Sequence, residues 1–222
     1  ARSGPEALLE EIRQLESASI KRIYLEELLQ SPLEKRLRDA VVEQVSEVNS
    51  TTAFIQSYQA LARIDPDDER FTEDLIDLAG RGTRASTRRR VLISLPALRM
   101  FTERNWVSLI ESAGGIYFGP EKAQVLVEIL ELTPLKGEMA RAFMKVTSSI
   151  KSSTRKSRVL QEVIKKGNLD SGMASLVTDA TRSVHSNPIR AEVLSRLALE
   201  LPDEKRLWRS SWRALQICLS PA

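Results

Sequence analysis

Few side chains in this sequence have the type and spacing that catalysis or metal binding requires. His185 is the only histidine and Cys218 the only cysteine. A protein zinc site needs several such ligands, and a nucleophile needs a base beside it, so one residue of each type predicts neither. Gly114 and Gly115 lack the sequence context of a phosphate-binding loop and predict a turn between helices. We expect no catalytic residue, no metal ligand and no cofactor, although a site built only from carboxylates stays open.

The most regular polar feature is a row of cations at constant spacing, which we call the cation ladder. It consists of Arg88, Lys122, Lys156 and Arg190, at intervals of 34 residues. On stacked helices about 8–10 Å apart, these side chains would line one side of the array, at a spacing that suits a phosphate backbone or an acidic peptide. The alternative is that each stem covers apolar surface and each charge pairs with a neighbouring carboxylate. We favour this structural role, because a residue repeated in every unit usually serves the unit.

Other cations are less regular, and an irregular charge favours contact with a particular partner. The candidate binding residues, ladder included, are Arg84, Arg88, Arg89, Arg90, Lys122, Arg155, Lys156, Arg158 and Arg190. Residues 1–80 carry 9 basic and 17 acidic side chains, whereas residues 81–222 carry 24 basic and 13 acidic ones. Because a basic surface attracts anions, we expect a protein or peptide partner of acidic character, with a nucleic acid as the alternative.

Apolar residues recur with the same period as the cations. Val91, Val125, Val159 and Val193 are each followed by leucine and lie 34 residues apart. Around them the apolar side chains fall at the spacing of amphipathic helices. A fixed period of this length is typical of solenoids built from helix pairs. No run approaches the roughly 18 apolar residues of a membrane-spanning helix, so we expect no membrane span in this chain.

These patterns predict an all-α fold. We expect a right-handed α-solenoid of about six helix-turn-helix repeats with a period of 34 residues, in a single domain at residues 1–222. The repeats are expected at residues 5–31, 32–65, 66–100, 101–133, 134–167 and 168–201, followed by a capping helix at residues 203–219. In the capping helix, Trp208 and Trp212 are expected to cover the last repeat, with a tryptophan cage for a ligand as the alternative.

Certain residues predict where helices begin and break. Equivalent positions that predict N-caps of the second helix of a repeat are Thr51, Gly119, Ser153 and Asn187. Pro96 lies within the otherwise helical residues 91–100, where it removes one backbone hydrogen bond. We therefore expect a kinked helix here and a local change in the path of the solenoid.

The period resembles that of tetratricopeptide repeats, and the geometry is also HEAT-like. Residues 120–126 and 155–160 are similar to a Ser-Asp-Tyr-Glu-(Lys/Arg)-X-(X)-Val-Leu pattern. That pattern belongs to helical repeats C-terminal to the peptidase region of some bacterial membrane metallopeptidases, related to the beta-lactam-sensing antirepressor peptidases. The likeness covers roughly residues 18–200. It implies a non-catalytic sensing or docking module outside the cytoplasm, whereas a cytoplasmic location is expected without it.

The sequence therefore predicts a scaffold that binds a macromolecular partner in the groove of the solenoid, without enzymatic activity. The first alternative is nucleic-acid binding by the basic part of the chain, which would make the affinity fall steeply with salt. The second is an enzyme on a helical-repeat scaffold, such as a base-excision glycosylase. Such an enzyme would need a carboxylate and aromatic side chains in a cleft.

Overall fold

The chain is helical throughout the part that the structure describes. The computed structural model describes residues 4–82, 84–166 and 169–201. These residues form twelve α-helices and one short 3-10 helix, η1, and they contain no strand. The predicted all-α class is thus confirmed. The expected capping helix, with Trp208, Trp212 and Cys218, lies outside the described residues.

Contacts divide the chain into two compact units, Ala1–Ile129 and Leu130–Ala222. The single domain expected from the sequence stays a prediction. Unit 1 contains α1 (Pro5–Gln14), α2 (Ala18–Leu28), α3 (Lys35–Ser46), α4 (Thr51–Leu61), α5 (Glu69–Gly80), α6 (Ala85–Ser94), η1 (Leu95–Ala97), α7 (Glu103–Gly114) and most of α8 (Gly119–Leu132). Unit 2 begins in the last turn of α8 and contains α9 (Gly137–Ser148), α10 (Ser153–Lys165), α11 (Ser171–Thr181) and α12 (Asn187–Glu200).

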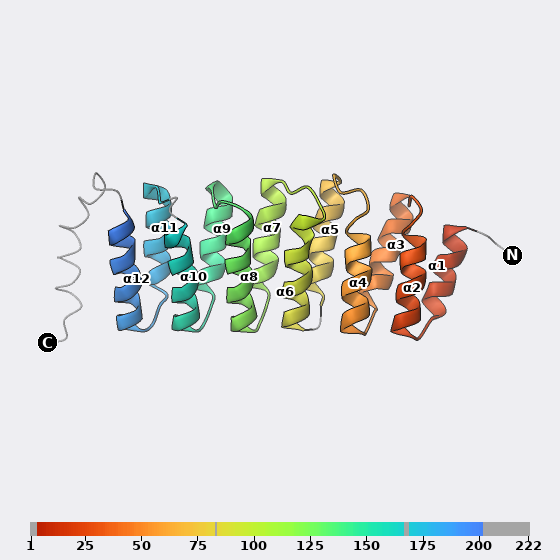
Figure 1. Cartoon of the computed structure of the whole chain (residues 1–222), viewed down its shortest axis with the longest axis horizontal. Helices are drawn as coiled ribbons and strands as arrows, with labels where there is room; N and C mark the ends of the chain where they lie inside the picture. Colours follow the sequence, from red (N-terminus) through yellow and green to blue (C-terminus); the bar gives the residue numbers. More distant parts are fainter. Residues whose placement is uncertain (1–3, 83, 167–168, 202–222) are drawn as a thin grey trace. The chain divides into compact units, whose positions relative to one another are not determined.

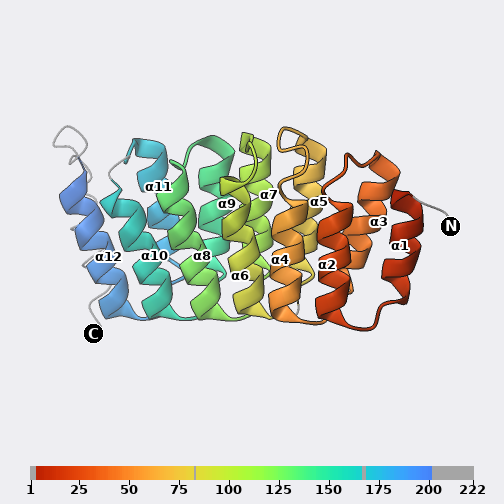
Figure 2. The ribbon, with the colours of Figure 1, turned by 45° about the vertical axis from the view of Figure 1, so that its right-hand side comes forward.

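Within unit 1 the helices alternate between two layers (Figure 1 and Figure 2). The odd-numbered helices contact one another in the order α1, α3, α5 and α7, and the even-numbered ones in the order α2, α4 and α6. Consecutive helices also touch across the layers, as α1 touches α2 and α5 touches α6. Each helix thus buries one stripe of side chains against its own layer and against the other layer.

Unit 2 repeats this arrangement with four complete helices. α9 contacts α11 in one layer, and α10 contacts α12 in the other (Figure 1). Across the layers, α10 touches both α9 and α11, and α11 touches α12. The same local rule therefore builds both units.

The core consists of the apolar residues whose spacing predicted the helices. In unit 1, Leu75 and Leu109 are fully buried in the odd layer, and Val91 and Val125 in the even layer. Val159 is the buried counterpart in unit 2. Burying such a side chain contributes about 1.5–3 kcal/mol. The periodic valine and leucine positions are thus a main source of stability in each unit.

Polar side chains cap several helices, one residue earlier than the sequence analysis placed the caps. The side chains of Ser50 and Ser152 each accept a hydrogen bond from the backbone N–H three residues further on. The positions predicted as caps, Thr51, Gly119, Ser153 and Asn187, are the first residues of α4, α8, α10 and α12. The correction follows from capping geometry, because the accepting side chain must stand just before the first helical residue.

Pro96 follows the end of a helix, so the expected kink is wrong. α6 stops at Ser94, and Pro96 lies in η1, directly after it. Proline has no N–H with which to continue the helical hydrogen bonds. A short 3-10 turn accepts proline near its start, where the N–H is not needed.

Candidate functional site

Cations of the ladder are held by the backbone of the protein itself. In unit 1, Arg88 Nη1 donates to the carbonyl of Gly115, the C-cap residue of α7, at 3.0 Å. In unit 2, Lys156 Nζ donates to the carbonyl of Ser183, just past the end of α11, at 2.7 Å. Both contacts reach 27 residues forward along the chain. Each cation therefore lies at the negative end of the dipole of the next odd-numbered helix.

Lys156 is used so fully by this contact that little of it remains accessible. It is only 2% exposed, and Nζ also donates to Ser183 Oγ at 2.8 Å. Burial lowers the pKa of its ammonium group below the ordinary lysine value. An ammonium group in this position stabilises a helix end and has little surface left for a partner.

The remaining ladder residues are also engaged. Arg190 Nη2 and Nε donate to the carbonyl of Val184 at 2.8 and 3.1 Å, and Lys122 has a partner within the chain as well. Arg88 lies so close to α7 that a Cβ added to Gly115 would stand 2.9 Å from Nη2. These contacts favour the structural role that we expected for the ladder.

Lys21 also reaches the end of the next odd-numbered helix, through side chains rather than backbone carbonyls, and the sequence analysis missed it. It is the fourth residue of α2, as Arg88 is of α6 and Lys156 is of α10. Lys21 is 7% exposed, and Nζ donates to Gln44 Oε1 at 3.2 Å and lies 3.5 Å from Glu47 Oε2. The starts of α2 and α4 are 33 residues apart, whereas the later even-numbered helices start 34 residues apart. Lys21 therefore does not fall on the 34-residue spacing by which the ladder was recognised.

Arg89 joins two helices of the even layer of unit 1. Its Nε lies 2.6 Å from a carboxylate oxygen of Glu121, and its Nη1 lies 2.7 Å from Glu128 Oε1. Both carboxylates belong to α8, whereas Arg89 belongs to α6. Of the candidate binding residues, Arg89 is thus also occupied within the fold.

The candidates left accessible are the irregular ones. Arg84, Arg90, Arg155 and Arg158 are exposed. With the other described residues, none of these four side chains makes a hydrogen bond or an ion pair. The first two lie in unit 1 and the last two in unit 2. Their contact with a partner stays a prediction.

Arg99 is a buried residue that sequence analysis did not single out. Its Nε donates to Thr72 Oγ1 at 2.7 Å. Nη1 donates to the carbonyls of Ala62 and Ile64, and Nη2 to those of Asp65 and Asp68, at 2.6 to 3.3 Å. The guanidinium group thereby orders the connection between α4 and α5. No period marks Arg99, so its chain position alone offers no signal.

Phe71 lies close to two guanidinium groups, beside the same connection. The Cζ atoms of Arg38 and Arg99 are each 5.0 Å from the centre of its ring, which is a cation–π distance. The backbone N–H of Phe71 donates to Asp68 Oδ1 at 3.0 Å and holds the pKa of that carboxyl below its ordinary value; Arg38 acts in the same direction. These groups form a structural cluster, in which the Nε atom of Arg38 is buried without a hydrogen-bond partner in the described part of the chain.

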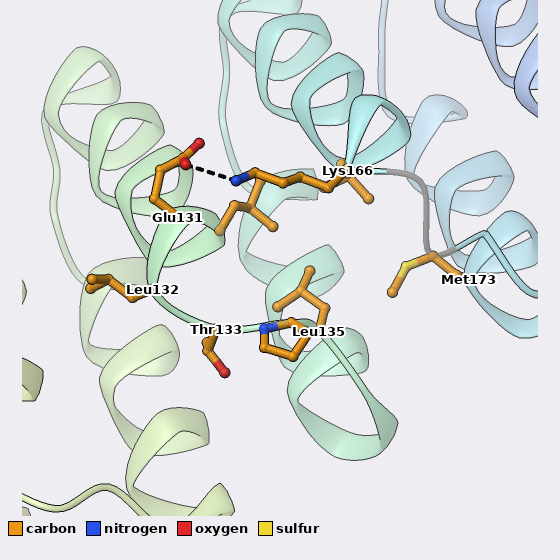
Figure 3. A pocket seen from close by; sticks show the side chains of 9 residues that line it. Glu131, Leu132, Thr133, Leu135, Lys166 and Met173 are labelled. Carbon is orange, nitrogen blue, oxygen red and sulfur yellow. Dashed lines mark hydrogen bonds and ion pairs between the residues drawn. The ribbon is translucent and has the colours of Figure 1, made fainter.

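A hollow of about 260 Å³ opens in unit 2 near the start of α11 (Figure 3). Lys166 Nζ and Glu131 Oε2 form an ion pair of 2.7 Å at this site, and Met173 extends toward it from α11. Its apolar wall, which defines what we call the apolar hollow, consists of Leu130, Leu132, Pro134, Leu135, Val163 and Met173.

A larger and more polar recess, of about 620 Å³, lies between α9 and α11; we call it the α9–α11 groove. Its small residues are Gly137, Ala140 and Gly172, and its cations are Lys136 and Arg141. Both cations are exposed, and within the described ranges neither side chain has a hydrogen bond or an ion pair. The groove shares Leu135 and Met173 with the apolar hollow. This pair of recesses is the candidate functional site.

Neither a metal-binding cluster nor a helix fit to span a membrane occurs in residues 4–82, 84–166 and 169–201. There, no three His, Cys, Asp or Glu side chains come close enough together to hold a metal ion. In the same residues, no helix combines the length and the apolar character needed to cross a membrane. His185 is exposed in the turn before α12.

Comparison with known proteins gives no relative for this chain. No family model, no curated protein and no solved structure matches it significantly. The resemblance to repeats that follow membrane metallopeptidases therefore stays a prediction.

Proposed function

We propose that this chain is a right-handed α-solenoid with a period of 34 residues and that it serves as a non-catalytic scaffold for a protein partner. The starts of the helices support the period. The even-numbered helices from α4 onward begin at residues 51, 85, 119, 153 and 187, and the odd-numbered ones from α3 onward at 35, 69, 103, 137 and 171. A constant step of this kind is what stacked helix pairs require.

The α9–α11 groove is the observation that supports binding of a partner. It is an open recess, it lies between two parallel helices of one layer, and it presents Lys136 and Arg141 without partners among the described residues. A cation with no role inside the fold can meet an anion from outside at little cost. A docking module of this kind also fits the role that the metallopeptidase-associated repeats would imply.

Selection of peptides tests this function. A library of random peptides displayed on phage is selected against the purified chain, and the enriched peptides are synthesised and titrated by calorimetry. We expect saturable binding to one class of site. A selection that enriches no peptide over an unrelated helical-repeat protein would contradict the function.

Single-stranded nucleic acid is the second candidate, and one observation in unit 1 favours it. Tyr117 is 77% exposed and Phe118 51% exposed, in the turn before α8. Arg88 donates to the carbonyl of Gly115, two residues before Tyr117, and its stem lies close to Gly82, two residues before the exposed Arg84. Exposed aromatic rings beside arginine are typical of surfaces on which bases stack.

Salt dependence tests the second candidate. Binding of a labelled single-stranded RNA is measured between low and moderate ionic strength. If RNA is the ligand, we expect the affinity to fall steeply with salt and to fall further when Tyr117 and Phe118 are both replaced by serine. Absence of RNA binding at low salt excludes this candidate.

A further inference from the structure

We infer that the partner segment seated in unit 2 is an acidic peptide with one apolar anchor residue, which enters the apolar hollow while its carboxylates contact the α9–α11 groove. This inference rests on the proposed protein-binding function and adds the chemistry of the partner. Its basis is the adjacency of two recesses of different character, since Leu135 and Met173 line both of them.

The charged residues of the site determine which sign of charge the peptide should carry. Glu131 is neutralised by Lys166 at 2.7 Å. The Asp170 carboxylate accepts the backbone N–H of Met173 at 2.7 Å and is thereby committed to the cap of α11. Asp170 keeps its negative charge and offsets one of the two cations Lys136 and Arg141, so the net charge offered to a partner is positive by one. An acidic segment satisfies it, and a basic segment would be repelled.

The size and walls of the apolar hollow determine the anchor. At about 260 Å³ it lies below the roughly 300–1,000 Å³ of sites for small molecules. Leu135, Val163 and Met173 line it and are buried in the free protein. A leucine, methionine or phenylalanine side chain suits such walls, and recognition through one buried anchor is common at protein interfaces.

Small residues of the groove favour a peptide over a bulkier ligand. Gly137, Ala140 and Gly172 place little side-chain volume along the recess. A Cβ added to Gly172 would meet only the Asp170 Oδ1 atom, at 3.3 Å. A peptide backbone can therefore approach α9 and α11 closely at these positions; Gly137, with a φ of 49°, is also required by its own backbone conformation.

Three peptides and two charge variants test the inference by fluorescence anisotropy. The peptides are a labelled acidic sequence with one central leucine, its leucine-to-alanine form, and a form with lysine in place of each acidic residue. We expect the leucine peptide to bind, and each of the other two to bind at least tenfold more weakly.

The double variant Lys136→Glu with Arg141→Glu should weaken binding of the leucine peptide at least tenfold. The control variant Lys151→Glu with Arg196→Glu replaces a matched pair of exposed cations in unit 2. It should change the affinity for the leucine peptide less than twofold.

A groove-filling variant provides the structural control. Gly172→Leu adds a side chain to the groove and, because leucine favours helix over glycine, should leave the helical circular dichroism intact while it weakens peptide binding at least tenfold. Unchanged affinity in both Gly172→Leu and the Lys136→Glu, Arg141→Glu variant overturns the inference and leaves the protein-binding function standing. If the acidic leucine peptide does not bind but selected peptides do, the inference is likewise wrong. If no peptide binds at all, both proposals fail.

Discussion

At the scale of single residues, Lys156 shows how a repeated cation serves the fold. Its buried ammonium group completes the hydrogen bonds of a carbonyl beyond the end of α11, where no helical N–H is available. The sequence revealed the spacing of the ladder, but spacing does not specify where a long, flexible side chain points. The direction comes from the helix end packed opposite, and that requires the structure.

Replacing Lys156 tests this role. Lys156→Met keeps most of the buried stem and removes the donor, so the carbonyl of Ser183 loses its partner. We expect the free energy of unfolding to fall by about 1–3 kcal/mol, measured by urea denaturation. Lys145→Met, at an exposed lysine without a partner among the described residues, should stay within about 0.5 kcal/mol of the wild type. Equal effects of the two changes would refute the structural role.

The pH dependence of stability gives a second test at the same residue. Because burial lowers the pKa of Lys156 in the folded state, the unfolded chain binds more protons than the folded chain between the folded and the ordinary pKa. Stability rises with pH wherever the unfolded state binds more protons. The stability of the wild type relative to Lys156→Met should therefore increase as the pH rises through this alkaline window. A difference that is constant or falls would contradict the shift.

At the scale of elements, one side chain orders a connection that lacks secondary structure. Arg99 reaches back from the segment before α7 and binds four carbonyls in residues 62–68. Asp65 in this segment has a φ of 42°, a conformation that aspartate tolerates better than most residues. Tertiary contacts thus fix a segment that local preferences leave open.

Removing the guanidinium group should therefore be costly. Arg99→Met deletes all five donors at once and leaves carbonyls without partners, so we expect a loss of about 3 kcal/mol or more in the free energy of unfolding. Arg90→Met, at an exposed arginine of the same unit, should change it by less than about 0.5 kcal/mol. Denaturation curves of both variants decide this, and a small effect of Arg99→Met would show that the connection is held by other contacts.

Pro96 gives a prediction of the opposite sign to that of a kinked helix. In a helix interior, Pro96→Ala would restore a hydrogen bond and stabilise the fold. In η1 the substitution Pro96→Ala restores no hydrogen bond, and it increases the conformational entropy of the unfolded chain. We therefore expect the free energy of unfolding to fall by about 0.4–1 kcal/mol. Thermal melting distinguishes the two cases by the direction of the shift, since a higher melting temperature would favour a strained proline.

At the scale of the whole molecule, the two units differ in the sign of their net charge. Among described residues, unit 1 carries 16 basic and 21 acidic side chains, and unit 2 carries 12 basic and 7 acidic ones. The sequence showed this polarity and the helical class, because both depend on composition and on a period of apolar residues. It did not show the α9–α11 groove, because a recess depends on which side chains are small where two helices meet, as at Gly137 and Gly172.

Stability in stacked helices is expected to be local. Among the described residues each helix makes its main contacts with the adjacent helices of the two layers, so damage should spread little along the chain. In native-state hydrogen exchange, Arg99→Met should lower the protection of amides in α4 to α7 and leave α10 to α12 largely unchanged. Lys156→Met should do the reverse. Uniform loss of protection in either variant would show that the chain unfolds as one cooperative body.

The forward reach of the ladder cations also bears on how such a chain can be lengthened by gene duplication. Arg88 with its acceptor Gly115, and Lys156 with its acceptor Ser183, lie within segments 85–118 and 153–186, each of which begins at an even-numbered helix. A duplication or exchange with these ends carries donor and acceptor together. A duplication that begins at an odd-numbered helix separates the donor from its acceptor. The flanking sequence must then supply the missing partner of each. The unit that preserves this contact on duplication is therefore an even-numbered helix with the odd-numbered helix that follows it, such as α6 with α7. A unit that begins with the odd-numbered helix, such as α5 with α6, does not preserve it.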